Sequence, residues 1–135
     1  MWSNINALTQ KIESSAGNVS GLVEQMGVEL KKAKQELLRV LAEEKRLRKL
    51  VAERKEHVEQ WLSRAELAVR SGNDEMARDA LIQRKRIADE VARDAAAAEE
   101  HAALAREMNG ELRIMESRFN DIAALRESPE AADRA

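Results

Sequence analysis

Apolar residues recur in alternating steps of three and four along most of this chain. One such stripe runs from Met26 to Ala68, and a second runs from Ala77 to Ile122. Residues three and four apart share a face of an α-helix, and a stripe kept over about six heptads is typical of a coiled coil. The pattern therefore predicts two long helices, each with one apolar seam that must be buried against a partner.

The sequence Ser71-Gly72-Asn73-Asp74 divides the two stripes. Gly72 suits the end of a helix because glycine adopts a positive φ without steric cost. Ser71, Asn73 or Asp74 can cap the next helix. A short turn makes the other arm the nearest partner, so we predict an all-α fold built on a long antiparallel coiled-coil helical hairpin. A bend in one continuous helix is the alternative.

A turn at this position sets the register of the two arms. Residues lie opposite each other when their numbers add up to about 145. The alanines of residues 95–105 then face the leucines of residues 37–50, and small side chains opposite large ones allow dense packing.

Several polar residues fall at or near this seam. Glu44 and Arg54 interrupt the first stripe. In the same register Glu44 lies opposite His101, which predicts a polar pair, and Trp61 lies opposite Arg84, which predicts a cation–π stack.

The chain divides into three parts. We expect a short amphipathic helical segment with a Gly/Ser-rich break, the hairpin itself, and a frayed, disordered tail that contains Pro129. Their expected limits are residues 1–21, residues 22–126 with arms at about 22–71 and 74–126, and residues 127–135.

The first segment carries candidate membrane-contact residues. On a helix they fall within an arc of about 120°, and they are Trp2, Ile5, Leu8 and Ile12. Tryptophan favours bilayer interfaces, but Lys11 is the only basic residue nearby, so lipid binding is expected to be weak and mainly hydrophobic. Packing of this face on the hairpin or on a partner chain is the alternative.

Composition removes several classes of function. Charged residues make up 36% of the chain, aromatic residues 2%, and the net charge is −2 with both signs interspersed, which argues against general nucleic-acid binding. The chain has no cysteine, no apolar run of about 20 residues and no signal-peptide pattern, so we expect a cytoplasmic location.

Catalytic chemistry has no support in the sequence. His57 and His101 are the only histidines, and the expected register separates them by about 20 Å. No phosphate-binding loop, dinucleotide fingerprint or nucleophile elbow occurs. We therefore expect no enzyme activity, no metal and no cofactor.

The region of the turn resembles the phage shock protein A family and its plastid relative, the vesicle-inducing protein in plastids. That family shows a tryptophan, an AELAL segment, an acidic turn and an ARxAL segment. The matching residues here are Trp61, Ala65-Glu66-Leu67-Ala68, Gly72-Asn73-Asp74-Glu75, Ala77-Arg78 and Ala80-Leu81. Asn4-Ile5-Asn6-Ala7-Leu8 and Gly110-Glu111-Leu112 resemble two further family segments, so the resemblance covers residues 4–125.

The resemblance implies a bacterial relative of the ESCRT-III superfamily. Such proteins bind stressed membranes, polymerise and remodel or protect the bilayer, and some inhibit a AAA+ transcription activator through the hairpin. We thus expect a scaffold or modulator of membrane-associated assemblies, an oligomer formed with itself or a full-length relative, at the inner face of the plasma membrane. The alternatives are a soluble regulator of a AAA+ activator or other protein, and a purely structural coiled coil.

The resemblance also implies where partners bind. The hairpin-tip interaction candidates are Trp61, Ala65, Glu66, Leu67, Gly72, Asn73, Asp74, Glu75, Arg78 and Leu81. The family's longer N-terminal membrane helix and its C-terminal helices have no counterpart here, so a short paralogue and a truncated form both remain open.

Overall fold

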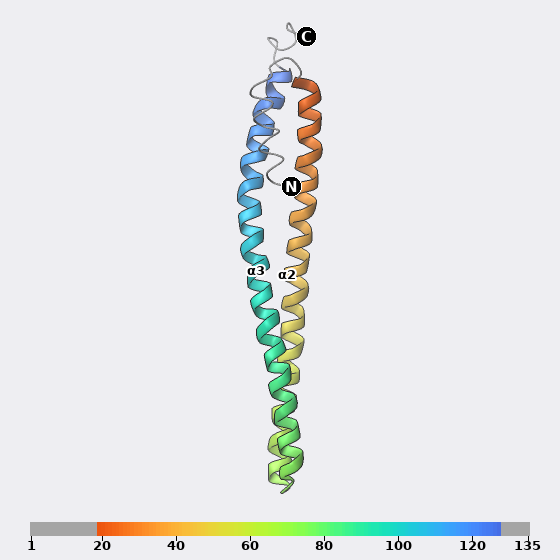
Figure 1. The fold of residues 1–135 in the computed structure, drawn as a ribbon, viewed down its shortest axis with the longest axis vertical. Coiled ribbons are helices and arrows are strands. Elements are labelled where there is room, and N and C mark those ends of the chain that lie inside the picture. The colour runs from red at the N-terminus through yellow and green to blue at the C-terminus, as the bar shows by residue number, and fades with distance from the viewer. Residues whose placement is uncertain (1–18, 128–135) are drawn as a thin grey trace. The chain divides into compact units, whose positions relative to one another are not determined.

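The computed structural model describes residues 19–127. Helix α2 comprises Val19–Arg70 and helix α3 comprises Asp74–Glu127. The two helices pack against each other as an antiparallel hairpin, and this part of the chain contains no strand (Figure 1). The predicted all-α hairpin is therefore confirmed, whereas most of the predicted N-terminal segment and C-terminal tail lies outside the described residues.

Helix α2 begins earlier than the expected start of the arm near Leu22. It begins at Val19, and Val19 and Leu22 both pack against a buried cluster that contains Val23 and Met26. Their spacing extends the apolar seam by one turn, and the packing of that turn outweighs the low helix propensity of Gly21.

The turn between the helices is closed by backbone hydrogen bonds. Gly72 has a φ of 73°, as predicted from its place in the sequence. The Asn73 N–H donates to the Ala68 carbonyl at 2.8 Å and the Gly72 N–H donates to the Val69 carbonyl at 3.1 Å. These two bonds form a Schellman motif, which satisfies the last carbonyls of α2.

Asn73 also starts the next helix. Its side-chain oxygen Oδ1 accepts a hydrogen bond from the Met76 N–H at 3.1 Å, which makes Asn73 the N-cap of α3. Asp74 and Glu75 follow in the first turn, where their negative charge complements the helix dipole. Because Asn73 belongs to both motifs, the reversal needs only three residues between the helices.

The hairpin divides into two compact units, and each contains a stretch of both helices. The first unit takes its described residues from 19–39 and 104–127, and it holds two apolar clusters. Leu30, Ala33, Leu112 and Met115 form one cluster, and Val23, Met26 and Ile122 form the other. Phe119 packs against both, so large side chains from the two helices interlock along this unit.

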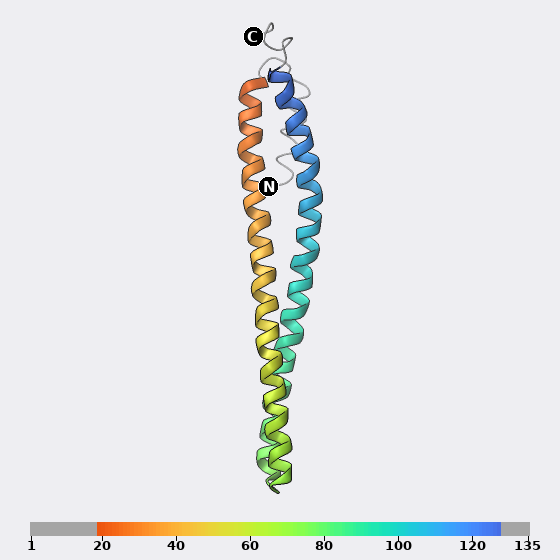
Figure 2. The same cartoon turned by 180° about the vertical axis from the view of Figure 1, so that it is seen from behind.

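The second unit, Val40–Ala103, ends in the turn and is built differently. Near the turn its two helices overlap in both views, with α3 in front in Figure 1 and α2 in front in Figure 2. Most of its buried apolar residues are alanines, namely Ala65, Ala68, Ala77, Ala80, Ala98 and Ala102, and the others are Val40 and Leu47. Alanine seams allow two helices to approach closely.

The expected packing of leucines against alanines is only partly correct. Leu47 is buried, as expected, but Leu38 and Leu41 lie on the exposed surface. Both exposed leucines fall outside the steps of three and four that define the seam. The seam therefore depends on fewer large side chains than the leucine-rich stretch predicts.

The second unit replaces apolar packing with a charged contact at Arg54. This side chain bridges α2 to Asp94 and, at 3.7 Å, to Glu90 on α3. Both carboxylates lie one turn apart on the same face of α3. Arg54 thus interrupts the seam, as the sequence indicates, but it does so as a cross-helix ion pair.

Two predicted polar contacts are wrong. Glu44 accepts a hydrogen bond from Arg48 at 2.8 Å, and His101 Nδ1 lies 2.8 Å from the Ala97 carbonyl oxygen, so these two side chains do not pair with each other. The guanidinium over the Trp61 ring belongs to Arg64, at 4.6 Å from the ring centroid, and not to Arg84. In each case a neighbour three or four residues away on the same helix takes the place of the expected partner across the seam.

Candidate interaction surface

A groove runs between the ends of the two helices beside the turn. It has a volume of about 490 Å³. Helix α2 contributes Trp61, Arg64, Leu67 and Ala68, and Ser71 follows in the turn. The other side is formed by Asn73, Met76, Asp79, Ala80 and Gln83, and we call this ten-residue surface the tip groove.

The helical repeat explains why these residues line one groove. On each helix they follow steps of three and four, so each set forms a single stripe. The two stripes meet along the alanine seam, where Ala68 and Ala80 are buried. These small alanines form the bottom of the groove, and the larger side chains on either side of them form its rim.

The rim of the tip groove is strongly apolar for a solvent-facing surface. The exposed fraction of Leu67 is 63% and that of Met76 is 61%. Trp61 is half-buried, and the Arg64 guanidinium lies on its ring. Exposed large apolar side chains that gather around a groove commonly mark a contact site for another molecule.

The structure brings together only part of the predicted tip set. Trp61, Leu67 and Asn73 line the tip groove. Ala65 is buried in the seam and Gly72 forms the turn. The remaining predicted residues are exposed but do not line the groove, and they are Glu66, Asp74, Glu75, Arg78 and Leu81.

The predicted tip set lacks the groove residues Ala68, Ser71 and Ala80, which lie in or beside the segments that carry the resemblance, and it also lacks Arg64, Met76, Asp79 and Gln83. The resemblance selected residues by motif, and the last four lie between or beside the matching segments. Projection of residues 61–83 onto two antiparallel helices would have found them, because they lie on the same stripes as Trp61 and Leu67. The feature of the sequence that indicates these groove residues is their helical spacing, not their residue type.

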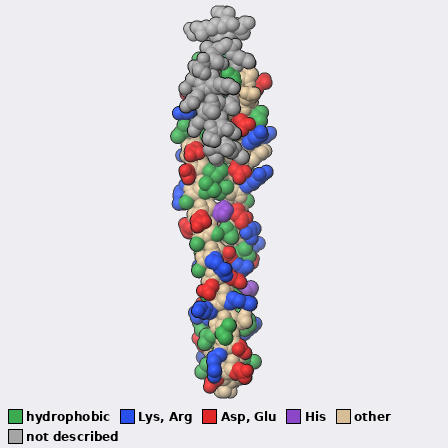
Figure 3. Space-filling model, in the orientation of Figure 1, with side chains coloured by type: hydrophobic (Ala, Val, Ile, Leu, Met, Phe, Trp, Pro, Cys, Tyr) green, Lys and Arg blue, Asp and Glu red, His purple; other side chains and the backbone are tan. Residues whose placement is uncertain are grey.

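All the ion pairs among the described residues lie farther from the turn. Lys34 bridges to Glu116 at 2.9 Å, and Arg48 bridges to Glu44 and to Glu99. Acidic and basic groups are interspersed over the face shown in Figure 3. A surface with both signs mixed in this way has no single-sign field that would attract nucleic acid.

The exposed ion pair between Glu43 and Arg46 shifts the pKa of both side chains. Arg46 Nη2 lies 2.6 Å from Glu43 Oε1, and the hydrogen bond from Arg46 holds the pKa of the Glu43 carboxyl below its ordinary value. The same contact raises the pKa of Arg46. The positive side chain stabilises the ionised carboxylate, so the contact favours the charged form of both groups.

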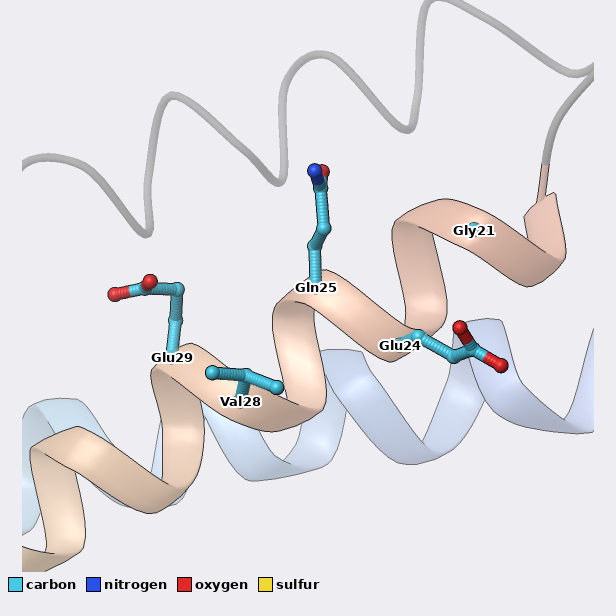
Figure 4. Close-up of a pocket in the computed structure, with 5 residues that line it drawn as sticks. All are labelled: Gly21, Glu24, Gln25, Val28 and Glu29. Carbon is cyan, nitrogen blue, oxygen red and sulfur yellow. The ribbon is translucent and has the colours of Figure 1, made fainter.

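A second hollow lies on the outer face of α2 and has a volume of about 550 Å³. Gly21, Glu24, Gln25, Val28 and Glu29 line it, all from successive turns of one helix (Figure 4). The carboxylates of Glu24 and Glu29 point in different directions, so they do not converge on one ligand position. Within residues 19–127 no group of three or more acidic or histidine side chains is placed to hold a metal ion.

The candidate membrane-contact residues Trp2, Ile5, Leu8 and Ile12 lie outside the described residues. Neither α2 nor α3 contains a stretch that is both long and apolar enough to cross a bilayer.

Comparison with known proteins identifies relatives of this hairpin. The model of the PspA/IM30 family matches residues 1–128. The membrane-associated protein Vipp1 of Synechocystis is 32% identical over 89 residues, which cover 66% of this chain and 33% of that protein.

Two plant relatives match more of the chain. The chloroplastic membrane-associated protein VIPP1 of rice is 28% identical over 114 residues, which cover 84% of this chain and 36% of that protein. The protein of the same name from Arabidopsis thaliana is 26% identical over 123 residues, which cover 91% of this chain and 37% of its own length. The chain spans about a third of the length of these relatives. Because the family model matches almost the whole chain, the chain belongs to the PspA/IM30 family.

Proposed function

We propose that this chain is a PspA-like membrane-stress response protein that acts as a scaffold or modulator of membrane-associated assemblies of its family. The observation that carries this proposal is the tip groove, whose apolar residues Trp61 and Leu67 stand in the segment that resembles the family. An exposed apolar surface on a thin hairpin is suited to binding another protein chain. The proposed role is non-enzymatic.

Contact with the bilayer is a second part of the proposal. The relatives in rice, Arabidopsis and Synechocystis are named as membrane-associated proteins. In this chain we assign lipid contact to Trp2, Ile5, Leu8 and Ile12, which the sequence places on one face of a helical pattern. With Lys11 as the only basic residue beside them, the contact is weak and peripheral, at the cytoplasmic side of the plasma membrane.

Binding to a family assembly can be tested by vesicle flotation. We would mix the full chain with vesicles that carry full-length Synechocystis Vipp1 and compare wild type with Leu67→Asp. The buried charge should lower recovery of the variant about tenfold, since Leu67 lies on the rim of the tip groove. Ile114→Asp is the matched control, because Ile114 is a similarly exposed apolar residue of α3 outside the groove.

Equal recovery of the two variants and wild type would contradict a role for the tip. Loss of recovery with both variants would place the contact on the whole hairpin surface instead.

Lipid contact is tested separately with vesicles alone. Trp2→Glu should reduce flotation of the chain, because a charge at this position opposes burial in the interface. Equal flotation of wild type and Trp2→Glu would end the membrane part of the proposal. It would favour the alternative of a soluble regulator that binds a AAA+ activator or another protein.

A further inference from the structure

The two charged side chains that line the tip groove form no ion pair within residues 19–127, although the Arg64 guanidinium lies on the Trp61 ring. Arg64 from α2 and Asp79 from α3 both line the groove, and neither forms an ion pair with another described residue. Among residues 19–127, no ion pair involves any residue between 55 and 89. The groove therefore combines an apolar rim with an unpaired positive charge on one helix and an unpaired negative charge on the other.

This distribution of charge is self-complementary. A two-fold axis through the groove brings the α2 side of one copy against the α3 side of the other. Arg64 of each copy then faces Asp79 of the partner subunit.

The apolar rim follows the same symmetry. Leu67 lies on α2 and Met76 on α3, and each is more than half exposed. Rotation about the axis places Leu67 of one copy against Met76 of the partner subunit, which removes both side chains from water. A strongly acidic or strongly basic partner would instead require a groove whose charged side chains all carry the opposite charge to that partner.

We propose that the tip groove binds a second copy of this chain, to form a two-fold dimer through the hairpin tips. The proposal rests on the proposed function in taking the tip as the contact surface, and it adds the partner and the symmetry. A contact confined to the tip groove involves few residues on each copy, so the dimer is expected to be weak and to form at high local concentration.

Charge reversal tests the pairing in solution without lipid. Sedimentation velocity of the full chain over a range of concentrations should show a reversible monomer–dimer equilibrium. Arg64→Glu and Asp79→Arg should each weaken the dimer about tenfold, because each replaces two attractive contacts with two repulsive ones. An equimolar mixture of the two variants should recover the wild-type affinity, because both cross-copy contacts then join opposite charges.

Arg106→Glu is the matched control. Arg106 is exposed on α3, has no ion pair among the described residues and lies outside the groove, so its reversal should leave the dimer unchanged. Circular dichroism should show the same helix content in all variants. A chain that stays monomeric at every concentration, or a mixture that fails to recover affinity, would overturn the proposal.

Disulfide formation locates the contact. The chain has no cysteine, so a mixture of Leu67→Cys and Met76→Cys chains should give a crosslinked heterodimer on oxidation. A mixture of Ile114→Cys and Met76→Cys should not. Crosslinking in the second mixture alone would move the interface away from the tip and overturn the proposal.

The outcomes separate this inference from the proposed function. A monomeric chain that still floats with family assemblies overturns only the second-copy partner, and leaves the tip groove to a segment of another family member. A tip dimer that does not float with those assemblies supports the inference and contradicts the proposed function.

Discussion

At the scale of single residues, Gly72 carries the reversal of the chain. Its φ of 73° is strained for any residue with a Cβ, although a Cβ there would meet no atom within 4 Å. Gly72→Ala should therefore lower the free energy of unfolding by about 1 kcal/mol through backbone strain alone. Urea unfolding followed by circular dichroism measures the change.

Gly110 gives a control of opposite sign. It lies within α3, and a Cβ there also meets no atom within 4 Å, but its φ is not in the left-handed region. Gly110→Ala should raise the free energy of unfolding by about 0.5–1 kcal/mol, because alanine is the better helix former. If both substitutions shifted stability in the same direction, the account of the turn would be wrong.

Arg54 forms the ion pairs that join α2 to Glu90 and Asp94 of α3 across the seam. The exposed fraction of its side chain is 33%, and that of Asp94 is 23%. Arg54→Ala leaves two partly buried carboxylates without their cation, so it should lower the free energy of unfolding by about 1–2 kcal/mol. Arg39→Ala, at a side chain that is 79% exposed, should cost less than about 0.5 kcal/mol. Similar costs for the two in thermal unfolding would contradict the role given to Arg54.

The stabilisation provided by the Glu43–Arg46 contact depends on pH. The pKa of Glu43 is lower in the folded chain than in the unfolded one, because Arg46 donates to its carboxylate. The stabilisation is present above the unfolded pKa and is lost as the pH falls through the folded pKa. In an NMR titration, Arg46→Gln should return the pKa of Glu43 towards its ordinary value, and an unchanged titration would exclude Arg46 as the cause.

Single-residue contacts were the least predictable feature. The left-handed Gly72 followed from its place between two apolar stripes, because few residues other than glycine suit that position. The stack on Trp61 was assigned to Arg84, whereas Arg64 provides it. A partner three residues away is available in any register, while a partner across the seam depends on the register and on competing contacts.

At the scale of helices, the first unit depends on large interlocking side chains. Leu112 has an exposed fraction of 6% and packs in the cluster with Leu30, Ala33 and Met115. Leu112→Ala should lower the free energy of unfolding by about 2–4 kcal/mol, because it removes buried apolar surface and leaves a cavity. Ile114→Ala, two residues away on the exposed face, should cost less than about 1 kcal/mol. Equal costs in urea unfolding would place Leu112 outside the core.

The helices themselves were well predicted, because their apolar spacing persists over many turns. The start of α2 was not, since the small and polar residues around Gly21 resemble a break. Val19 and Leu22 continue the seam through that stretch, and their packing decides where the helix begins. The predicted register agrees with the packing of Ala33 and Leu112 in one cluster and with Phe119 beside Met26.

At the scale of the whole molecule, family membership adds what periodicity cannot. A stripe of apolar residues predicts a hairpin, but many unrelated proteins share that architecture. The motifs around the turn identified the family, and the match over residues 1–128 confirms it. The tip groove required the structure, because it is formed by the meeting of two stripes from separate helices.

The central claim is that the chain works through the hairpin tip. The most direct measurement places a photo-crosslinking amino acid at position 67 or position 114 of the full chain, in a mixture with full-length Synechocystis Vipp1 on vesicles. The account predicts protein adducts from position 67 and none from position 114, since only Leu67 lines the tip groove although both residues are exposed. Equal adducts from both positions, or adducts from position 114 alone, would contradict it.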